Sequence, residues 1–144
     1  MKRTFILATA LAAIVGLGAV PASANSIKIQ QYGWANAAGG AQAGWKNKIG
    51  VYQKGWKNEA VAHQNGWKNT SAIGQDGHKN SATTIQNGGW NAAGIGQFGG
   101  HHNAIVVQDG YGNVAAGVQV GNGCNGAVTQ SGSGNVAAFV QTCP

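Results

Sequence analysis

Glutamine recurs at every eleventh residue along most of the chain, and this period constrains the fold more than any other feature. Counted from each glutamine, glycine stands two residues later in all ten units, and asparagine stands five residues later in eight of them. Fixed internal periods are typical of architectures in which copies of one structural unit stack on each other. The recurring glutamines are Gln31, Gln42, Gln53, Gln64, Gln75, Gln86, Gln97, Gln108, Gln119, Gln130 and Gln141.

The glycine of each unit argues against a helical repeat. An 11-residue period also occurs in right-handed coiled coils. A glycine inside a helix, however, costs about 1 kcal/mol relative to alanine, whereas turns use glycine for backbone angles that other residues resist. We therefore expect these glycines in turns: Gly33, Gly44, Gly55, Gly66, Gly77, Gly88, Gly99, Gly110, Gly121 and Gly132.

Alternate residues between each asparagine and the next glutamine follow one pattern: asparagine, a residue that is mostly small, an apolar residue and glutamine, as from Asn91 to Gln97. A period of two is the signature of a β-strand. The pattern predicts strands of about seven residues and turns of about four, so the chain reverses every 11 residues and returns every 22. The asparagines of the pattern are Asn25, Asn36, Asn47, Asn58, Asn69, Asn80, Asn91, Asn113 and Asn135.

Two arrangements of these strands are open: a flat antiparallel meander, or a coil in which each strand lies on the second strand after it. In the coil, each position stacks on itself at a spacing of about 4.8 Å, so amide side chains can bond in ladders. Buried amides are costly unless they are hydrogen-bonded, which favours the coil. We predict an all-β fold, a two-sheet β-solenoid (β-helix) of about five and a half coils with the cross-β stacking of amyloid.

The chain begins with a segment that resembles a secretory signal peptide. Lys2 and Arg3 precede an apolar stretch, and the sequence from Ala22 to Ala24 offers a cleavage site between small residues. The predicted organisation is a signal peptide at 1–24, a repeat solenoid at 25–141 and a tail at 142–144. No membrane insertion is predicted, because the apolar stretch is shorter than the roughly 20 residues that a spanning helix needs.

Charge is sparse and mostly positive. Beyond residue 24 the chain has seven lysines, three acidic residues and no arginine, for a net charge of +4. Such a basic stripe could attract nucleic acid or anionic polysaccharide. A solvated edge is the simpler interpretation, and nucleic acid is not predicted as a partner because arginine, the usual reader of bases and phosphates, is missing. Four lysines recur in the turns: Lys46, Lys57, Lys68 and Lys79.

Neither catalysis nor metal binding is expected from the repeat positions of the ionisable residues. The acids fall in different turns or on outer strand faces, so no acid pair forms, and no nucleophile group is indicated. The histidines occupy different repeat positions and do not converge as a zinc site requires. We therefore predict no enzyme activity and no cofactor. The residues concerned are Glu59, Asp76, Asp109, His63, His78, His101 and His102, the last in an asparagine position.

The two cysteines fall one coil apart on the same edge of the predicted solenoid. Cys124 replaces an asparagine of the pattern, and Cys143 follows Gln141 by two residues. An oxidising exterior permits a disulfide, and closing a loop of about 20 residues stabilises by about 3 kcal/mol in the chain-entropy model. We expect this disulfide; the alternative is two separate thiols.

Aromatic and aliphatic side chains are expected on the outer surface. Trp34 and Trp56 share a turn position on one edge, and Trp45 and Trp67 share it on the other. Such rows could stack within a fibre or bind sugars or neighbouring fibres. Outward aliphatic side chains in the C-terminal half predict a bundling face: Ile105, Val107, Val114, Val118, Val136 and Val140.

The repeat starts and stops close to the ends of the mature chain, so both ends of the solenoid are expected to present strand edges without a cap. The pattern Gln-x-Gly-x-x-Asn-x-Ala-x-x-x-Gln, which spans Asn25 to Gln141, resembles that of the curlin repeat proteins, which form curli amyloid on bacterial surfaces. The resemblance implies a secreted, extracellular fibre subunit that assembles with copies of itself, with nucleator and export-channel proteins as partners and a role in adhesion and biofilm matrix.

Two features qualify what the resemblance implies. The family often has a short segment after the signal peptide that addresses the subunit to its export channel, and little room for it is expected here. Regular units favour a major fibre subunit over a minor nucleator of the same fibre. The competing hypothesis is a soluble solenoid that binds a surface polysaccharide through its tryptophan rows.

Overall fold

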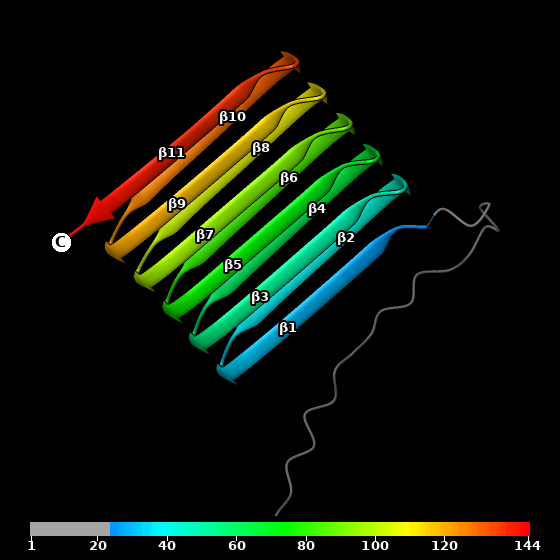
Figure 1. Cartoon of the computed structure of the whole chain (residues 1–144). Helices are drawn as coiled ribbons and strands as arrows, with labels where there is room; N and C mark the ends of the chain where they lie inside the picture. Colours follow the sequence, from blue (N-terminus) through cyan, green and yellow to red (C-terminus); the bar gives the residue numbers. More distant parts are fainter. Residues whose placement is uncertain (1–23) are drawn as a thin grey trace, which may run out of the picture.

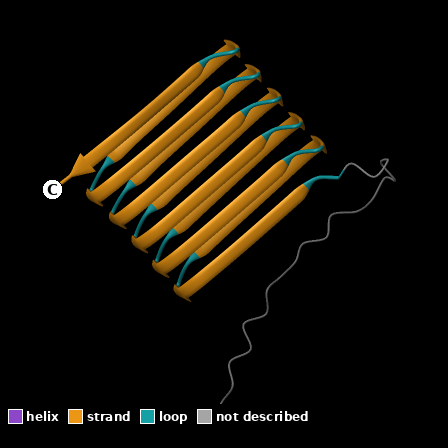
Figure 2. Ribbon diagram, in the orientation of Figure 1, coloured by secondary structure: helices purple, strands orange, loops and turns teal. Residues whose placement is uncertain are grey.

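The computed structural model of the chain describes residues 24–144, and every regular element in this range is a β-strand (Figure 1 and Figure 2). No helix in this range is long and apolar enough to cross a membrane. The strands are β1 (Ser26–Trp34), β2 (Ala37–Trp45), β3 (Lys48–Trp56), β4 (Glu59–Trp67), β5 (Thr70–His78), β6 (Ser81–Gly89), β7 (Ala92–Gly100), β8 (Asn103–Tyr111), β9 (Val114–Asn122), β10 (Asn125–Ser133) and β11 (Val136–Cys143).

The strands form two parallel sheets that wind as one coil. Sheet A contains the odd-numbered strands in the order β1-β3-β5-β7-β9-β11, and sheet B contains the even-numbered strands from β2 to β10. Each strand pairs with the second strand after it. All residues of a strand therefore lie beside the residue 22 positions later in the chain, as Gln53 lies beside Gln75. The predicted two-sheet solenoid is confirmed, and the antiparallel meander is excluded.

The strands are longer and the turns shorter than the sequence pattern predicts. All strands but β11 have nine residues, and only two residues separate consecutive strands. The prediction of seven-residue strands is wrong because parallel pairing continues through the glycine, which is the penultimate residue of its strand. These glycines bend the strand with positive φ, such as 114° at Gly55, and the two residues between the strands, such as Lys57 and Asn58, complete the reversal.

The ends of the described range differ in detail from the predicted domain boundaries. β11 continues to Cys143, so only Pro144 of the predicted tail 142–144 lies beyond the last strand. The predicted signal peptide at 1–24 lies outside the described residues except for Ala24.

The interior between the sheets is narrow because small residues alternate with medium-sized ones. Ala60 and Val106 are fully buried, and Ile49 is 3% exposed. Facing residues come from consecutive strands: the Oγ of Ser71 in β5 lies 2.6 Å from Oγ1 of Thr84 in β6. The seventh residue after a glutamine in one sheet therefore faces the ninth residue after a glutamine in the other.

Gly55→Ala should prevent the solenoid from forming, whereas Gly50→Ala in the same strand should be tolerated. A Cβ on Gly55 would overlap the carbonyl oxygen of Gly77, and its φ of 114° resists any L side chain. Gly50 has ordinary extended backbone, and no atom lies within 4 Å of the position that a Cβ on this residue would take. Circular dichroism and thioflavin T fluorescence of both variants provide the measurement. Normal cross-β assembly of Gly55→Ala would contradict the close approach of the Gly55 backbone to the Gly77 carbonyl.

Candidate assembly surfaces

The glutamines form a continuous ladder of amide hydrogen bonds along each sheet. Gln64 Nε2 donates to Gln86 Oε1 at 2.7 Å, and Gln86 Nε2 donates to Gln108 Oε1 at 2.8 Å. From Gln42 onward, the second N–H of each amide donates to a backbone carbonyl of the preceding strand, as from Gln86 to Thr70 at 3.0 Å. Each interior amide thus uses both of its N–H groups while fully enclosed, and within residues 24–144 no buried side-chain nitrogen or oxygen lacks a partner.

The asparagines also stack, but mainly through the backbone rather than through each other. Asn47 Oδ1 accepts the backbone N–H of Asn69 at 3.0 Å, and Asn47 Nδ2 donates to the carbonyl of Gly66 at 2.9 Å. Asparagine is one methylene shorter than glutamine and lies beside the bend. It therefore satisfies the glycine carbonyl of the bend in the next coil, a role that differs from the expected amide-to-amide ladder.

Histidine and cysteine occupy the two positions of the pattern that lack asparagine. The backbone N–H of Cys124 donates to His102 Nδ1 at 3.1 Å, so the proton is on Nε2, which donates to the Phe98 carbonyl at 3.2 Å. His102 thus accepts from the backbone of the next coil and donates to the carbonyl four residues before it, as Asn47 does. Cys124 forms a disulfide with Cys143, which joins the start of β10 to the end of β11.

The four strand edges at the two ends of the solenoid are unpaired within residues 24–144. At one end, β1 and β2 expose side chains whose equivalents are buried in the coils inside the stack: Ile27 and Ile29 are 46% and 40% exposed, whereas Ile49 and Val51, one coil further, are each 3% exposed. The ends of the stack therefore combine open backbone hydrogen-bonding groups with open apolar interior.

The glutamine ladder makes these two ends complementary. At the β10–β11 end, Gln130 and Gln141 accept from the preceding coil and donate to backbone, but among residues 24–144 their Nε2 atoms have no glutamine acceptor beyond them. At the β1–β2 end, Gln31 and Gln42 donate to the next coil, and no donor reaches their Oε1 atoms from within residues 24–144. One end thus presents amide donors and the other presents amide acceptors.

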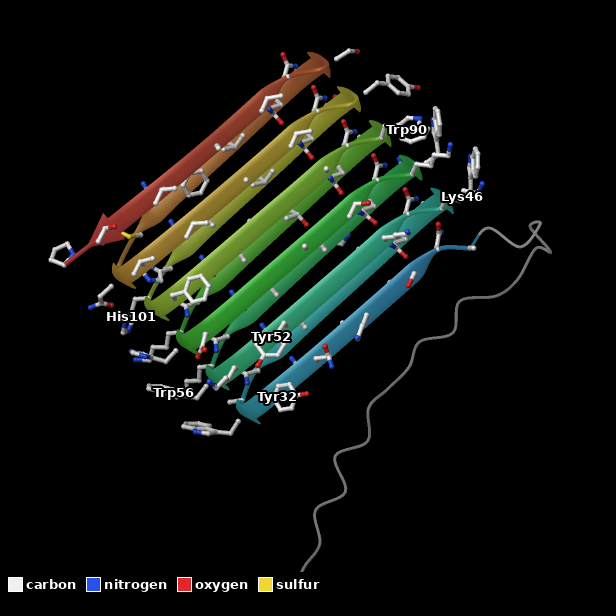
Figure 3. All side chains as sticks on the ribbon, viewed as in Figure 1. Tyr32, Lys46, Tyr52, Trp56, Trp90 and His101 are labelled. Carbon is white, nitrogen blue, oxygen red and sulfur yellow. A yellow bond between two sulfur atoms is a disulfide. The ribbon has the colours of Figure 1, made fainter. Side chains whose placement is uncertain are left out.

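Aromatic and lysine side chains line both edges of the solenoid (Figure 3). Trp34 stacks on Trp56 with ring centroids 5.5 Å apart, and on the opposite edge Trp45 stacks on Trp67 at 5.7 Å. Lysines of the next turn position lie over these rings, as Lys46 lies 5.0 Å from the Trp45 centroid. The tryptophans thus stack within the chain and remain partly exposed.

Each aromatic row is longer than the tryptophan positions predict. Trp56 stacks on His78 at 4.9 Å, and the His78 ring lies 5.2 Å from that of His101. On the other edge, Trp67 contacts Tyr111 and Trp90, and Lys68 Nζ lies 3.8 Å from the Trp90 centroid. His78 and Tyr111 share the turn position of the tryptophans, and this signal could have identified both residues.

The remaining ionisable residues do not form a metal or acid centre in the described part of the chain. Residues 24–144 contain no group of three or more histidine, cysteine, aspartate or glutamate side chains that could hold a metal. His63 and Asp109 lie on sheet B, and Asp76 lies on sheet A, where its carboxylate pairs with Lys54 at 3.4 Å. The pair is about half exposed, so it contributes little stability.

Gln86→Leu should destabilise the solenoid by about 2 kcal/mol or more, because the Gln108 Oε1 atom and the Thr70 carbonyl both lose their amide donor. Leucine has nearly the volume of glutamine and leaves no large cavity. Gln30→Leu is the matched control, since Gln30 is exposed on the outer face. The guanidinium midpoint of the assembled protein measures the effect. Equal midpoints for both variants would show that the ladder adds no stability.

Reduction of the disulfide between Cys124 and Cys143 should loosen β10 and β11 selectively. The bond closes a sequence separation of 19 residues, which stabilises by about 3 kcal/mol in the chain-entropy model. Hydrogen exchange of the amides in β10 and β11 should accelerate after reduction, while exchange in β5 and β6 should not change. Uniform acceleration in all strands, or none, would contradict a local role.

Comparison with known proteins gives one family match. The family model of the curlin associated repeat matches residues 77–110, from the glycine of one repeat unit to the glycine three units later. No curated protein matches the chain.

Proposed function

Because this chain carries the curlin associated repeat, we propose that it is a structural subunit of a secreted amyloid fibre of the curli type, which grows by stacking copies end to end. One observation carries the proposal: the two ends of the solenoid expose complementary halves of the same hydrogen-bond ladder. A second copy at either end would continue the ladder, cover the exposed isoleucines and pair the open strand edges.

The number of strands determines how the second copy attaches. The described residues form eleven strands, six in sheet A and five in sheet B. Stacking β1 of the next copy on β10, and its β2 on β11, continues both sheets without a gap. Stacking β1 on β11 instead would leave an empty strand position in sheet B. Successive copies are therefore related by about half a turn, and sheet A of one copy continues as sheet B of the next.

The contacts at this junction match those inside the chain. Gln130 Nε2 would donate to Gln31 Oε1 of the next copy, and Gln141 Nε2 would donate to its Gln42 Oε1. These bonds repeat the ones inside the chain, where Gln108 donates to Gln130 and Gln119 donates to Gln141. Ile27 would cover Gly126, and Ile29 would cover Val128. The junction thus repeats the packing of an ordinary coil.

The proposal includes the cellular setting. The subunit is exported behind its signal peptide at 1–24, polymerises on the bacterial surface and contributes to adhesion and biofilm matrix. Its partners are copies of itself, a nucleator and an export channel. Regular units from Gln31 to Gln141 favour a major subunit over a nucleator, and a structural rather than enzymatic role agrees with the family match.

The second candidate function is a soluble module that binds a surface polysaccharide. The observation that favours it is the pair of aromatic rows with lysines over the rings, since aromatic faces and cations suit anionic sugars. The two functions differ in assembly: a fibre subunit converts to long cross-β fibres, whereas a binding module stays a discrete particle with its polysaccharide bound.

Ala138→Pro should turn the subunit into a chain terminator. The Val114 N–H donates to the Asn135 carbonyl at 2.8 Å, and residues alternate sides in a parallel ladder, so Ala138 directs its N–H away from β9 toward the open edge. Proline there removes no bond of the solenoid but blocks the next copy. Small amounts of the variant should stop the growth of wild-type protein at the β10–β11 ends of seeds, followed by thioflavin T fluorescence and electron microscopy of polar growth.

Ala116→Pro is the matched control, because Ala116 lies beside Ala138 in β9 and directs its N–H toward β11. This variant breaks the solenoid itself and should not terminate growth at low ratios. If small amounts of Ala138→Pro leave the seeded growth of wild-type protein unchanged, or if the wild-type protein remains a discrete particle without cross-β diffraction, end-to-end assembly is wrong.

A further inference from the structure

The outer face of sheet A has a shallow groove that runs across the strands from β1 to β9. Its volume is about 530 Å³, and Lys28 and Tyr52 stand near one end of it (Tyr52 is labelled in Figure 3). The floor follows the eighth residue after each glutamine, where the side chains are absent or small: Gly50, Ala72, Gly94 and Ala116.

The fold itself does not require glycine in this groove. Gly50, Gly74 and Gly94 have ordinary extended backbone, and no atom lies within 4 Å of where their Cβ would stand. Glycine inside a strand weakens it and often marks a place where another backbone or a ligand approaches closely. The absence of side chains at these glycines is therefore better explained by another molecule that packs against the groove than by a requirement of the solenoid backbone.

The outer face of sheet B has the opposite shape at the same position. There the eighth residue after each glutamine is β-branched in three consecutive strands: Val61, Thr83 and Ile105. Ile105 is 38% exposed. Over β4, β6 and β8, sheet B thus carries a ridge where sheet A carries a groove, whereas β2 and β10 have Gly39 and Ala127 at this position.

Ridge and groove lie at the same place across the width of the solenoid. Inside the core, the seventh residue after a glutamine faces the ninth, as the contact of Ser71 with Thr84 shows. The eighth residues of the two sheets therefore lie opposite each other across the core, on the two outer faces. A neighbouring fibre displaced along the sheet normal, without rotation, would place its ridge in this groove, with Ile105 against the backbone of Gly94.

Charge on the two faces is also complementary. The lysines on outward strand positions are all in sheet A, namely Lys28, Lys48 and Lys54, and Asp76 accompanies them. The outward acids of sheet B are Glu59 and Asp109, and no lysine lies on that face in the described strands. The formal charges are thus +2 on one face and −2 on the other, with histidine neutral. Opposite charges on facing surfaces favour this pairing over contacts between like faces.

We propose that the groove of sheet A receives the sheet B ridge of a second copy in a neighbouring fibre, so that fibres bundle side by side. This rests on the proposed fibre function. Because successive copies turn by half a turn, each flank of a fibre alternates groove and ridge faces. In a neighbouring fibre that is displaced without rotation, a ridge then faces a groove at every subunit. Both sides of a fibre can bind a neighbour in this way, so the fibres form flat ribbons. Sheets that face each other across the contact are about 10 Å apart.

The test compares Gly94→Ile with wild type, using protein expressed from the full chain, purified in denaturant and assembled into fibres. Isoleucine suits the extended backbone at position 94 but fills the groove, so single fibres should form normally while the laterally paired fraction falls about tenfold or more. Ile105→Gly, which removes the Ile105 side chain from the ridge, should give the same result. Electron microscopy measures the paired fraction, and a reconstruction shows which faces meet.

Two controls separate this contact from general stickiness. Thr83→Ile keeps the ridge and should pair like wild type. The double variant Gly94→Ile with Ile105→Gly exchanges ridge and groove at one contact and should recover pairing relative to either single variant.

Unchanged pairing of Gly94→Ile and Ile105→Gly fibres would overturn the inference. So would wild-type fibres that stay single, or that hold a different molecule in the groove. Each of these results leaves end-to-end growth intact, whereas a wild-type chain that forms no fibres would overturn the proposed function itself.

Discussion

The structure depends on stacking each glutamine amide on the identical amide one coil away. A buried primary amide has two donors and an acceptor to satisfy, and the parallel in-register ladder provides both a side-chain and a backbone partner at each interior step. Enclosed amides are costly when any partner is missing. A shift of register by one residue would therefore lose every ladder bond at once, so the ladder enforces a period of 22 residues throughout.

The bends follow from the same stacking. Adjacent coils are about 4.8 Å apart, so the backbone of one glycine passes directly over that of the next, and a Cβ on Gly55 would overlap the Gly77 carbonyl. The asparagine at the start of each following strand then donates to a glycine carbonyl of the next coil. Glutamine, glycine and asparagine thus act together at each reversal: the glutamine ladder sets the spacing of the coils, glycine permits the close approach of the bends, and asparagine donates to the glycine carbonyl.

Several features can be predicted from the repeat, and others cannot. The alternation from Asn47 to Gln53 identifies the inward face, because period two places alternate residues on opposite faces of a strand. The strand ends are predicted wrongly, because glycine is read as a turn residue although parallel pairing continues through Gly55. The partner of the Asn47 amide is also predicted wrongly. Its choice between a neighbouring amide and the Gly66 carbonyl depends on the exact path of the backbone at the bend, which spacing alone does not specify.

The sequence by itself determined the coil, its 22-residue period, the inward rows and the approach of Cys124 to Cys143, because each of these follows from counting positions along a repeating chain. Only the tertiary structure decided what the two sheets present to their surroundings. The groove of sheet A, the ridge of sheet B and the donor and acceptor ends arise where residues from many coils lie side by side, and side-chain size and hydrogen-bond direction become comparable only once those coils are stacked.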